Sequence, residues 1–236
     1  MTVLVVRPDD NFSQRLRDAG VEVINLDLLD TEVLEDLSEF EDLISRIDEY
    51  DGVFFTSPAA AKVFADRVRP TVKLGLYALG ERAAAVLEGA GFKVRRVPHA
   101  NTAEEMLAGF GSDEFSGKKL LFVSGERSMR TIPETLGAIA NVDEVAVYRT
   151  IEVEPADDVT GEIRGKLATG EIEWVCFFSP SAVHAFEKRF GSGRKVAAIG
   201  ETTAARAREM GFDIGLTASR AASDVFAKEL IARLAH

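Results

Sequence analysis

Short apolar runs alternate with stretches of helical periodicity along the whole chain. The stretches between the runs, such as residues 11–19, repeat apolar positions at the spacing of an amphipathic helix. The alternation predicts βαβ units with helices on both faces of parallel sheets, and the apolar character of the runs indicates strands buried on both sides. The runs are residues 3–6, 21–26, 52–55, 74–79, 92–97, 119–123, 143–148, 174–178, 195–199 and 212–217.

The pattern occurs twice. "ALGERAAAVLEGAGF" (78–92) matches "AIGETTAARAREMGF" (198–212) at an offset of 120 residues, and "GVFFTSPAAAKVF" (52–64) matches "VCFFSPSAVHAF" (175–186). Upstream of these, "VLVVRP" resembles "LLFVSG". A repeat of this length indicates two duplicated domains rather than a solenoid, whose repeats are much shorter.

The repeats place small residues where strands end and helices begin. Ser57 and Ser179 precede a proline and occupy N-cap positions, while Gly80 and Gly200 open helices and leave the first N–H groups uncovered. A purely architectural role is the alternative for each corner, since every such turn needs a cap. Ligands of parallel α/β sheets bind outside the carboxyl ends of the strands, and helix N-termini attract anions. Two domains presenting matching corners across a cleft would therefore suit a ligand with several carboxylates or phosphates.

Composition narrows the range of partners. The chain has 236 residues, 46% of them hydrophobic, which suits two modest domains, and its net charge of −11 argues against a nucleic-acid partner. The one cysteine, Cys176, lies in an apolar run and is expected to be a buried core thiol rather than a nucleophile.

No cofactor or metal is expected. The sequence has neither G-x-G-x-x-G nor a P-loop, and His99, His184 and His236 show no metal-binding spacing. The start, "MTVLVVRP", does not resemble a signal peptide, and no apolar run is long enough to span a membrane. We therefore expect a cytoplasmic protein with neither nucleic acid nor membrane as a partner, and we expect a monomer because nothing in the sequence suggests an obligate dimer.

In the order and spacing of its motifs, the chain resembles the uroporphyrinogen-III synthase family over nearly its whole length. The motifs are "LVVRP" (4–8), "FFTSPAAAKVF" (54–64), "ALGERAAAVLEGAGF" (78–92), "LFVSGERS" (121–128), "VAVYRT" (145–150), "FFSPSAVHAF" (177–186) and "AIGETTAARAREMGF" (198–212).

The resemblance implies a strand exchange between the two halves. Residues 1–27 would join residues 155–236 in one discontinuous domain, and residues 36–147 would form an inserted domain. The linkers, 28–35 and 148–154, would run side by side as a two-stranded hinge. Each domain would carry a five-stranded, flavodoxin-like parallel sheet.

The resemblance also implies a reaction. Family members cyclise hydroxymethylbilane, a linear tetrapyrrole with eight acetate and propionate carboxylates, to uroporphyrinogen III with loss of water and inversion of ring D. This step belongs to tetrapyrrole biosynthesis, which leads to haem, sirohaem and cobalamin, and it needs no cofactor. The alternatives are a non-catalytic, two-lobed binding protein for a small polyanion and, less supported because nucleotide motifs are missing, a sugar-nucleotide transferase.

Carried over residue by residue, the resemblance assigns roles in this chain. Tyr148 is the candidate to bind or protonate the departing hydroxyl, with packing at the domain junction as its alternative. Thr203 matches a carboxylate-binding threonine, whereas the equivalent position in the first half holds Ala83. Arg7 could pair with a substrate carboxylate or form a structural ion pair. The other expected substrate-binding residues are Thr56, Ser57, Gly80, Ser124, Gly125, Ser179, Gly200 and Thr202.

Overall fold

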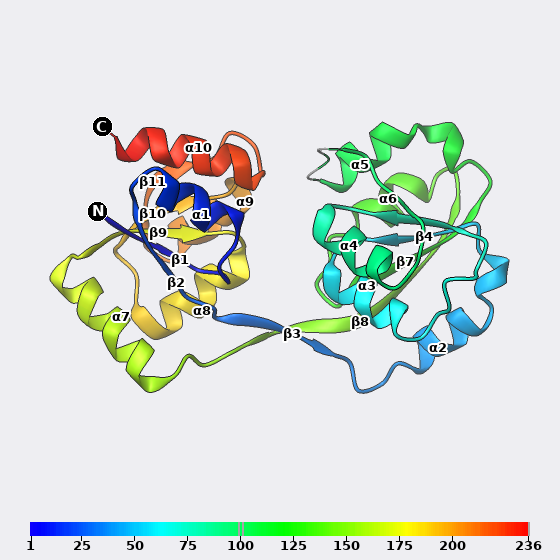
Figure 1. Ribbon diagram of the computed structural model, residues 1–236, viewed down its shortest axis with the longest axis horizontal. Coiled ribbons are helices and arrows are strands. Elements are labelled where there is room, and N and C mark those ends of the chain that lie inside the picture. Colours follow the sequence, from blue (N-terminus) through cyan, green and yellow to red (C-terminus); the bar gives the residue numbers. More distant parts are fainter. Residues whose placement is uncertain (99, 101, 236) are drawn as a thin grey trace. The chain divides into compact units, whose positions relative to one another are not determined.

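The chain forms two compact units. The computed structural model describes residues 1–98, 100 and 102–235, so two of the three histidines considered above, His99 and His236, lie outside the described residues. Met1–Asp30 and Ile151–His236 make up the first unit, and Thr31–Thr150 makes up the second (Figure 1).

The first unit holds a five-stranded sheet in the order β11-β10-β9-β1-β2. All its strand pairs are parallel, and β1 lies between β9 and β2, with Val5 opposite both Cys176 and Asn25. The strands are β1 (Thr2–Val5), β2 (Glu22–Asn25), β9 (Ile172–Phe177), β10 (Lys195–Ala198) and β11 (Asp213–Thr217).

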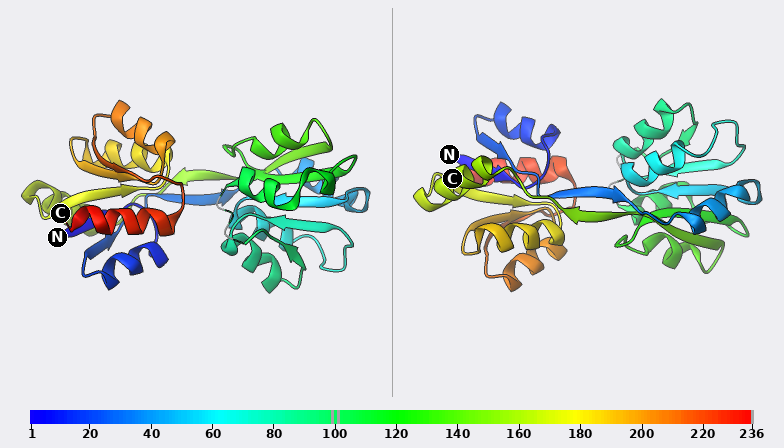
Figure 2. Two further views of the ribbon diagram at one scale, coloured as in Figure 1. Left: turned by 90° about the horizontal axis from the view of Figure 1, so that it is seen from above. Right: turned by 90° about the horizontal axis from the view of Figure 1, so that it is seen from below.

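Helices cover both faces of this sheet (Figure 2). One face carries a core around Phe177, Phe186 and Phe212, and the other a core around Phe12 and Phe226. The first core is closed by α7 (Asp157–Thr169), α8 (Pro180–Phe190) and α9 (Glu201–Glu209), and the second by α1 (Asn11–Asp18) and α10 (Ser223–Leu234).

The second unit repeats this sheet and adds a strand, in the order β3-β8-β7-β4-β5-β6. The expectation of five strands is wrong here because the linker segment Leu29–Val33 forms β3 beside the long β8. Backbone bonds from Leu34 N to Val147 O (3.1 Å) and from Val153 N to Leu28 O (3.0 Å) show that the two segments run antiparallel. The other strands are β4 (Gly52–Phe55), β5 (Gly75–Ala78), β6 (Val94–Arg95), β7 (Lys119–Gly125) and β8 (Asn141–Glu152).

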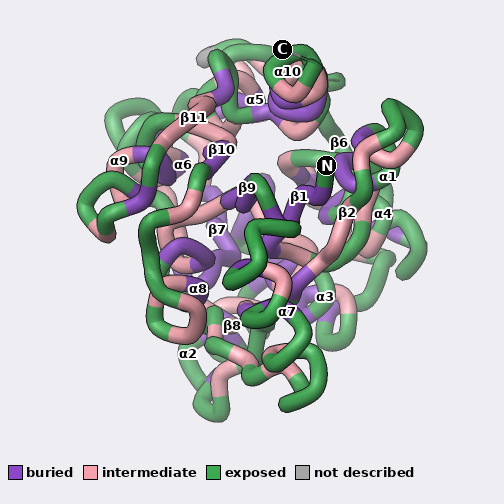
Figure 3. Tube along the Cα trace, turned by 90° about the vertical axis from the view of Figure 1, so that its left-hand side faces the viewer, coloured by how far each residue is buried: buried purple, intermediate pink, exposed green. Residues whose placement is uncertain are grey.

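The second sheet is also covered on both faces. Phe55 and Phe64 belong to the core on one face, and Phe54 and Phe122 to the core on the other. Buried positions concentrate in the central strands of both sheets, such as β9 and β7, while exposed positions lie on the outer sides of the helices (Figure 3). The helices are α2 (Ser38–Ser45), α3 (Pro58–Ala65) and α4 (Glu81–Gly89) on the first face, with α5 (Ala103–Phe110) and α6 (Thr131–Leu136) on the second. Two short 3-10 helices complete the unit, η1 (Ile47–Glu49) and η2 (Ser112–Glu114).

The strand orders reveal how the duplicated halves combine. β9, β10 and β11 in the first unit correspond to β4, β5 and β6 in the second, and β1 and β2 correspond to β7 and β8. The first sheet therefore combines β1 and β2 from the first half of the chain with β9, β10 and β11 from the second half. The second sheet combines β7 and β8 from the second half with β4, β5 and β6 from the first. β1 and β7 lie where the strand order reverses. The predicted fold class, two flavodoxin-like α/β domains, is confirmed.

All ten apolar runs contain strands, although the run at 92–97 contributes only the two residues of β6. Cys176 is buried and free, as expected, and burial raises the pKa of its thiol. None of the described helices is long and apolar enough to cross a membrane.

Candidate functional site

The two Ser-Pro corners are helix caps in both units. Ser57 Oγ accepts a hydrogen bond from Ala60 N (3.1 Å), and Ser179 Oγ accepts one from Ala182 N (3.2 Å). Both serines are half-buried, and neither hydroxyl donates a hydrogen bond to another described residue. Each O–H therefore stays available to an incoming acceptor while its oxygen caps the helix.

The glycine corners leave helix starts without side-chain caps. Gly80 precedes α4 and Gly200 precedes α9, and no side chain caps either helix. The first N–H groups of both helices can therefore serve an anionic ligand, with the helix dipole favouring negative charge there.

The threonines beside Gly200 differ in exposure. Thr202 is exposed, whereas Thr203 is buried, with 4% of its surface accessible. Ala83, at the equivalent position of the second unit, is also buried. The structure thus makes Thr202 the more accessible hydroxyl at this corner, and Thr56, before the Ser57 cap, is half-buried.

Arg7 is engaged in an ion pair. Its guanidinium contacts the carboxylate of Asp10, which caps α1, and stacks on the ring of Phe178 at 4.2 Å from the centroid. Its backbone carbonyl accepts a hydrogen bond from Asn25 Nδ2 at 3.1 Å. The sequence left two roles open for Arg7, binding a substrate carboxylate or forming an internal ion pair. The structure contains the internal ion pair.

Ser124 and Gly125 end β7 in the second unit, and both are buried. The Ser124 hydroxyl lies 3.3 Å from Glu144 Oε1, so it is held inside the unit. Gly125 pairs with Tyr148 on β8, and a Cβ built on Gly125 would lie 2.5 Å from Tyr148 Cζ. Only a glycine leaves room for the Tyr148 ring, which lies directly over this backbone.

A small cavity opens where β7 and β8 reach their carboxyl ends. Its volume is about 120 Å³. The turn that forms it is closed by two hydrogen bonds, from Ser128 N to Gly125 O (2.9 Å) and from Gly125 N to Ser128 Oγ (2.8 Å). Six residues line the cavity: Gly125, Glu126, Arg127, Ser128, Tyr148 and Thr150.

Sequence reasoning identified Tyr148 and Gly125 but missed Arg127, Ser128 and Thr150. The stretch "GERS" (125–128) ends the motif "LFVSGERS", and a Gly-x-x-Ser turn directly after a buried strand is the signal that could have found these residues.

Tyr148 is distinguished from the other two tyrosines of the chain by its hydroxyl. Tyr50 donates to Asp143 Oδ2 (2.5 Å), and Tyr77 donates to Glu114 Oε1 (2.8 Å). Burial is the main reason that the pKa of Tyr77 is raised to about 12, and the hydrogen bond to Glu114 is the second. Burial also raises the pKa of Tyr50. The Tyr148 hydroxyl has no hydrogen-bond partner among residues 1–98, 100 and 102–235, so it remains free to meet a substrate.

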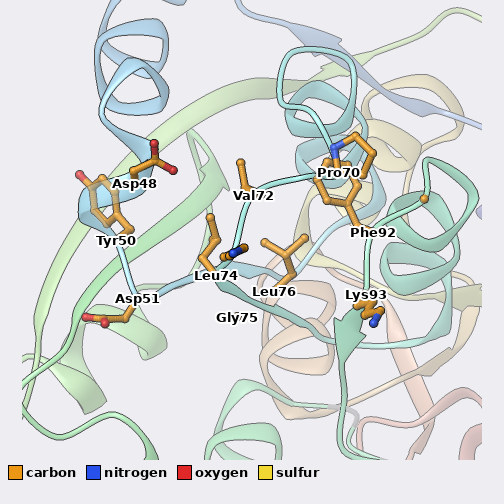
Figure 4. A pocket seen from close by; sticks show the side chains of 12 residues that line it. Asp48, Tyr50, Asp51, Pro70, Val72, Leu74, Gly75, Leu76, Phe92 and Lys93 are labelled. Atoms are coloured by element: carbon orange, nitrogen blue, oxygen red, sulfur yellow. The ribbon is translucent and has the colours of Figure 1, made fainter.

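A larger cavity of about 680 Å³ lies at the opposite edge of the second unit's sheet (Figure 4). Asp51 and Gly75 stand at the amino ends of β4 and β5, and exposed Lys73 and Lys93 also line it. None of the predicted site residues lies there. Parallel α/β sheets bind their ligands at the carboxyl edge, so we place the candidate site around Tyr148.

No group of three or more His, Cys, Asp or Glu residues in the described part of the chain is arranged to hold a metal ion.

Comparison with known proteins assigns the chain to a family. The family model described as "Uroporphyrinogen-III synthase HemD" matches residues 10–227. The uroporphyrinogen-III synthase of Chlorobaculum parvum is 25% identical over 243 residues, covering 97% of each chain. That of Proteus mirabilis is 24% identical over 188 residues, covering 75% of this chain and 92% of the relative.

Solved structures share the fold. The uroporphyrinogen-III synthetase of Helicobacter pylori superposes with a TM-score of 0.63 at 16% identity, covering 98% of each chain. A mutant uroporphyrinogen III synthase from Thermus thermophilus gives a TM-score of 0.54 at 16% identity, covering 100% of this chain and 99% of the other. The match of the family model over most of the sequence shows that the chain belongs to the uroporphyrinogen-III synthase family, whose members cyclise hydroxymethylbilane in tetrapyrrole biosynthesis.

Proposed function

We propose that the chain cyclises hydroxymethylbilane at the carboxyl edge of the second unit's sheet, with Tyr148 facing the departing hydroxyl. The observation that carries this proposal is the position of the Tyr148 ring and the unused hydrogen-bonding capacity of its hydroxyl. Its ring lies over Gly125, and its hydroxyl has no partner among the described residues. A rigid aromatic with an unused donor can meet a leaving group without losing an existing hydrogen bond.

The chemistry requires help at one oxygen. The lone pair of a pyrrole nitrogen expels the hydroxyl of the hydroxymethyl group, the C–O bond breaks, and an azafulvene cation forms. The leaving oxygen gains negative charge as the bond breaks, so an O–H donor aimed at it stabilises the transition state more than the ground state. Ring D then attacks through its substituted carbon, the spiro intermediate rearranges, and ring D loses its α-proton. The net change is loss of one water.

Binding requires local donors because enzyme and substrate are both anionic. The chain carries a net charge of −11, and the substrate has eight carboxylates. We propose that the second unit binds carboxylates through the first N–H groups of α4 and the Thr56 and Ser57 hydroxyls. In the first unit, the start of α9 and the Ser179 and Thr202 hydroxyls would do the same. Thr203 is buried, so its hydroxyl contributes less to carboxylate binding than the exposed Thr202 does.

We further propose that the chain acts as a cytoplasmic monomer. The support is that its exposed large apolar side chains are scattered along the sequence rather than gathered in one segment, and that its single cysteine is free, as in proteins of reducing compartments. Those side chains are Met1, Val33, Met129, Ile139 and Val159. Light scattering of the purified protein tests the oligomeric state.

The test of the site is Tyr148→Phe. We expect turnover to fall by one to two orders of magnitude, about 1.4–2.7 kcal/mol of barrier, with the fold retained. Some activity should remain, because the pyrrole nitrogen supplies most of the push. The measurement is formation of the type III isomer from enzymatically made hydroxymethylbilane.

Tyr50→Phe is the matched control. It removes a phenol hydroxyl from the same unit, but at the amino edge of the sheet, where the hydroxyl binds Asp143. Turnover should stay at the wild-type value in this control. Wild-type turnover in Tyr148→Phe as well would leave Tyr148 a packing residue.

A further inference from the structure

The cavity beside Tyr148 carries donors suited to an anion. Its lining holds three hydroxyl-bearing residues, Ser128, Tyr148 and Thr150, together with Arg127, Gly125 and the exposed Glu126. Complete sites for drug-sized ligands measure roughly 300–1,000 Å³, whereas this cavity measures about 120 Å³. It therefore fits one arm of a tetrapyrrole rather than the whole molecule.

The backbone around the cavity offers little to an anion. Glu126 N donates to Tyr148 O (3.0 Å), and the N–H groups of Gly125 and Ser128 are used within the turn. Arg127 is the cation among the lining residues, so its side chain is the strongest donor left for an anion here.

Neighbouring arginines are already paired, whereas Arg127 has no partner in the described part of the chain. Arg149 donates to Glu32 Oε2 from Nε (2.9 Å) and Nη2 (2.7 Å), and Arg130 lies 3.3 Å from Glu144. The exposed Arg127 forms neither a hydrogen bond nor an ion pair with any residue in the described part of the chain. The hydrogen bond with Glu32 raises the pKa of Arg149, and the charge of Glu126 adds a smaller contribution in the same direction.

The chemistry of the substrate suggests which anion Arg127 meets. Each pyrrole of hydroxymethylbilane carries carboxylate arms, and on one pyrrole these arms are close to the carbon that bears the hydroxymethyl group. We propose that Arg127 binds a carboxylate arm of that pyrrole and thereby holds its hydroxymethyl carbon at Tyr148. This inference rests on the proposed role of Tyr148.

The pairing would also serve the reaction. A guanidinium and a carboxylate form two parallel hydrogen bonds, which fix orientation as well as distance. Together the pair is neutral, so it adds no net positive charge beside the azafulvene cation. The ionised pyrrole would stay in place while the other end of the bilane swings round to attack.

The first experiment compares Arg127→Met with Arg127→Lys in steady-state kinetics on enzymatically made hydroxymethylbilane. We expect Arg127→Met to raise KM about tenfold to a hundredfold, the range for a lost hydrogen bond to a charged group, with a smaller change in kcat. Arg127→Lys should recover part of the loss, since it keeps the charge without the planar fork. Arg69→Met, which removes an exposed arginine elsewhere in the second unit, is the control and should leave KM unchanged.

The second experiment uses a synthetic bilane in which a carboxylate arm on the hydroxymethyl-bearing pyrrole is replaced by an alkyl group, tested for each of its two arms. With one of these analogues, the wild-type enzyme should lose as much affinity as Arg127→Met loses with the natural substrate. Arg127→Met should be indifferent to that replacement. An unchanged KM in Arg127→Met, or equal sensitivity of both enzymes to both analogues, would overturn the proposal.

This outcome is separable from that for Tyr148. Tyr148→Phe acts on kcat, whereas coupling between Arg127 and the substrate arm is read from KM alone. One possible result is that Arg127 and the substrate arm are coupled in KM while Tyr148→Phe keeps the wild-type kcat. That result would remove the proposed role of Tyr148 and still support carboxylate binding by Arg127.

Discussion

Gly80 in the second unit and Gly200 in the first occupy the same place in the repeat, yet their backbones differ. Gly80 has φ 77° and ψ 160°, a conformation that is almost restricted to glycine, whereas Gly200 has φ −176° and ψ 174°, which any residue adopts. A Cβ on Gly200 would meet only Ala221 Cβ, at 3.5 Å. Backbone strain therefore explains the glycine in one unit, and an uncovered helix start is the common reason in both.

A second pair of equivalent corners, those after β1 and β7, differs in how its polar side chains are paired. In the first unit, Arg7 is paired with Asp10, and Asn25 donates to the Arg7 carbonyl and to Ser13 Oγ (2.8 Å). In the second unit, the equivalent corner is lined by Arg127 and Tyr148, whose side chains have no polar partner among the described residues. The duplicated fold thus satisfies the polar groups of one corner internally and leaves Arg127 and Tyr148 at the other without a partner among the described residues, which is why we propose that the chemistry takes place in the second unit.

The largest expected effect comes from replacing the two glycines. Gly80→Ala should destabilise the second unit by about 1–3 kcal/mol, because alanine is strained in that conformation. Gly200→Ala should change the stability of the first unit by less than about 0.5 kcal/mol. Urea unfolding, monitored in each unit by hydrogen exchange, measures both changes in the free energy of unfolding. Equal destabilisation by the two substitutions would contradict the difference in backbone conformation between Gly80 and Gly200.

The two serine caps should behave alike. Ser57→Ala and Ser179→Ala should each cost about 1 kcal/mol of stability, since each removes the acceptor for one helix N–H group. If the hydroxyls also bind carboxylates, KM should rise more than kcat falls in both variants. Earlier melting with unchanged kinetics would make both corners architecture alone.

The smallest effect concerns ion pairs near the linkers. Arg189 in the first unit, with 7% of its side chain exposed, binds Glu152 (3.2 Å), whereas Arg149 in the second is 46% exposed. Arg189→Met should therefore lower Tm more than Arg149→Met.

The same pair gives a pH dependence. Hydrogen bonding from Lys188, with help from Arg189, lowers the pKa of Glu152. A lowered folded-state pKa stabilises the protein above the unfolded value, near about 4.3, and this contribution is lost as the pH falls through the lowered value. The Tm difference between wild type and Glu152→Gln should thus be present at about pH 7 and close below about pH 4. A difference independent of pH would contradict this linkage.

Much of this architecture follows from local pattern. Apolar runs, the 120-residue repeat and the Ser-Pro corners predict the strands, the duplication and the caps, because each depends on a few neighbouring residues. The pairing of the two linker segments as a two-stranded hinge was predicted, but not that β3 counts as a sixth strand of the second sheet, because β8 runs from that sheet into the hinge without a break. β6 is shorter than its run, since only Val94 and Arg95 pair with β5, opposite Leu76 and Tyr77.

The site was less predictable because it depends on tertiary contacts. The ion pair of Arg7 with Asp10 joins residues three apart and was one of the two roles expected for Arg7, whereas the lack of an ion-pair partner for Arg127 in the described part of the chain depends on where the fold places the acidic residues around it. Gly125 was identified as a substrate-binding residue, but its clearest role in the structure is to make room for the Tyr148 ring, and that depends on the register between β7 and β8.

The exchange of strands between halves also imposes an order on biosynthesis. The second unit lies in one continuous stretch, Thr31–Thr150, so the ribosome has made all its strands, except the last two residues of β8, before Ile151–His236 exists. β1 is made first, but its neighbour β9 begins only at Ile172. The oldest strand of the nascent chain must therefore wait, with one edge unpaired, until the last third of the protein has been translated.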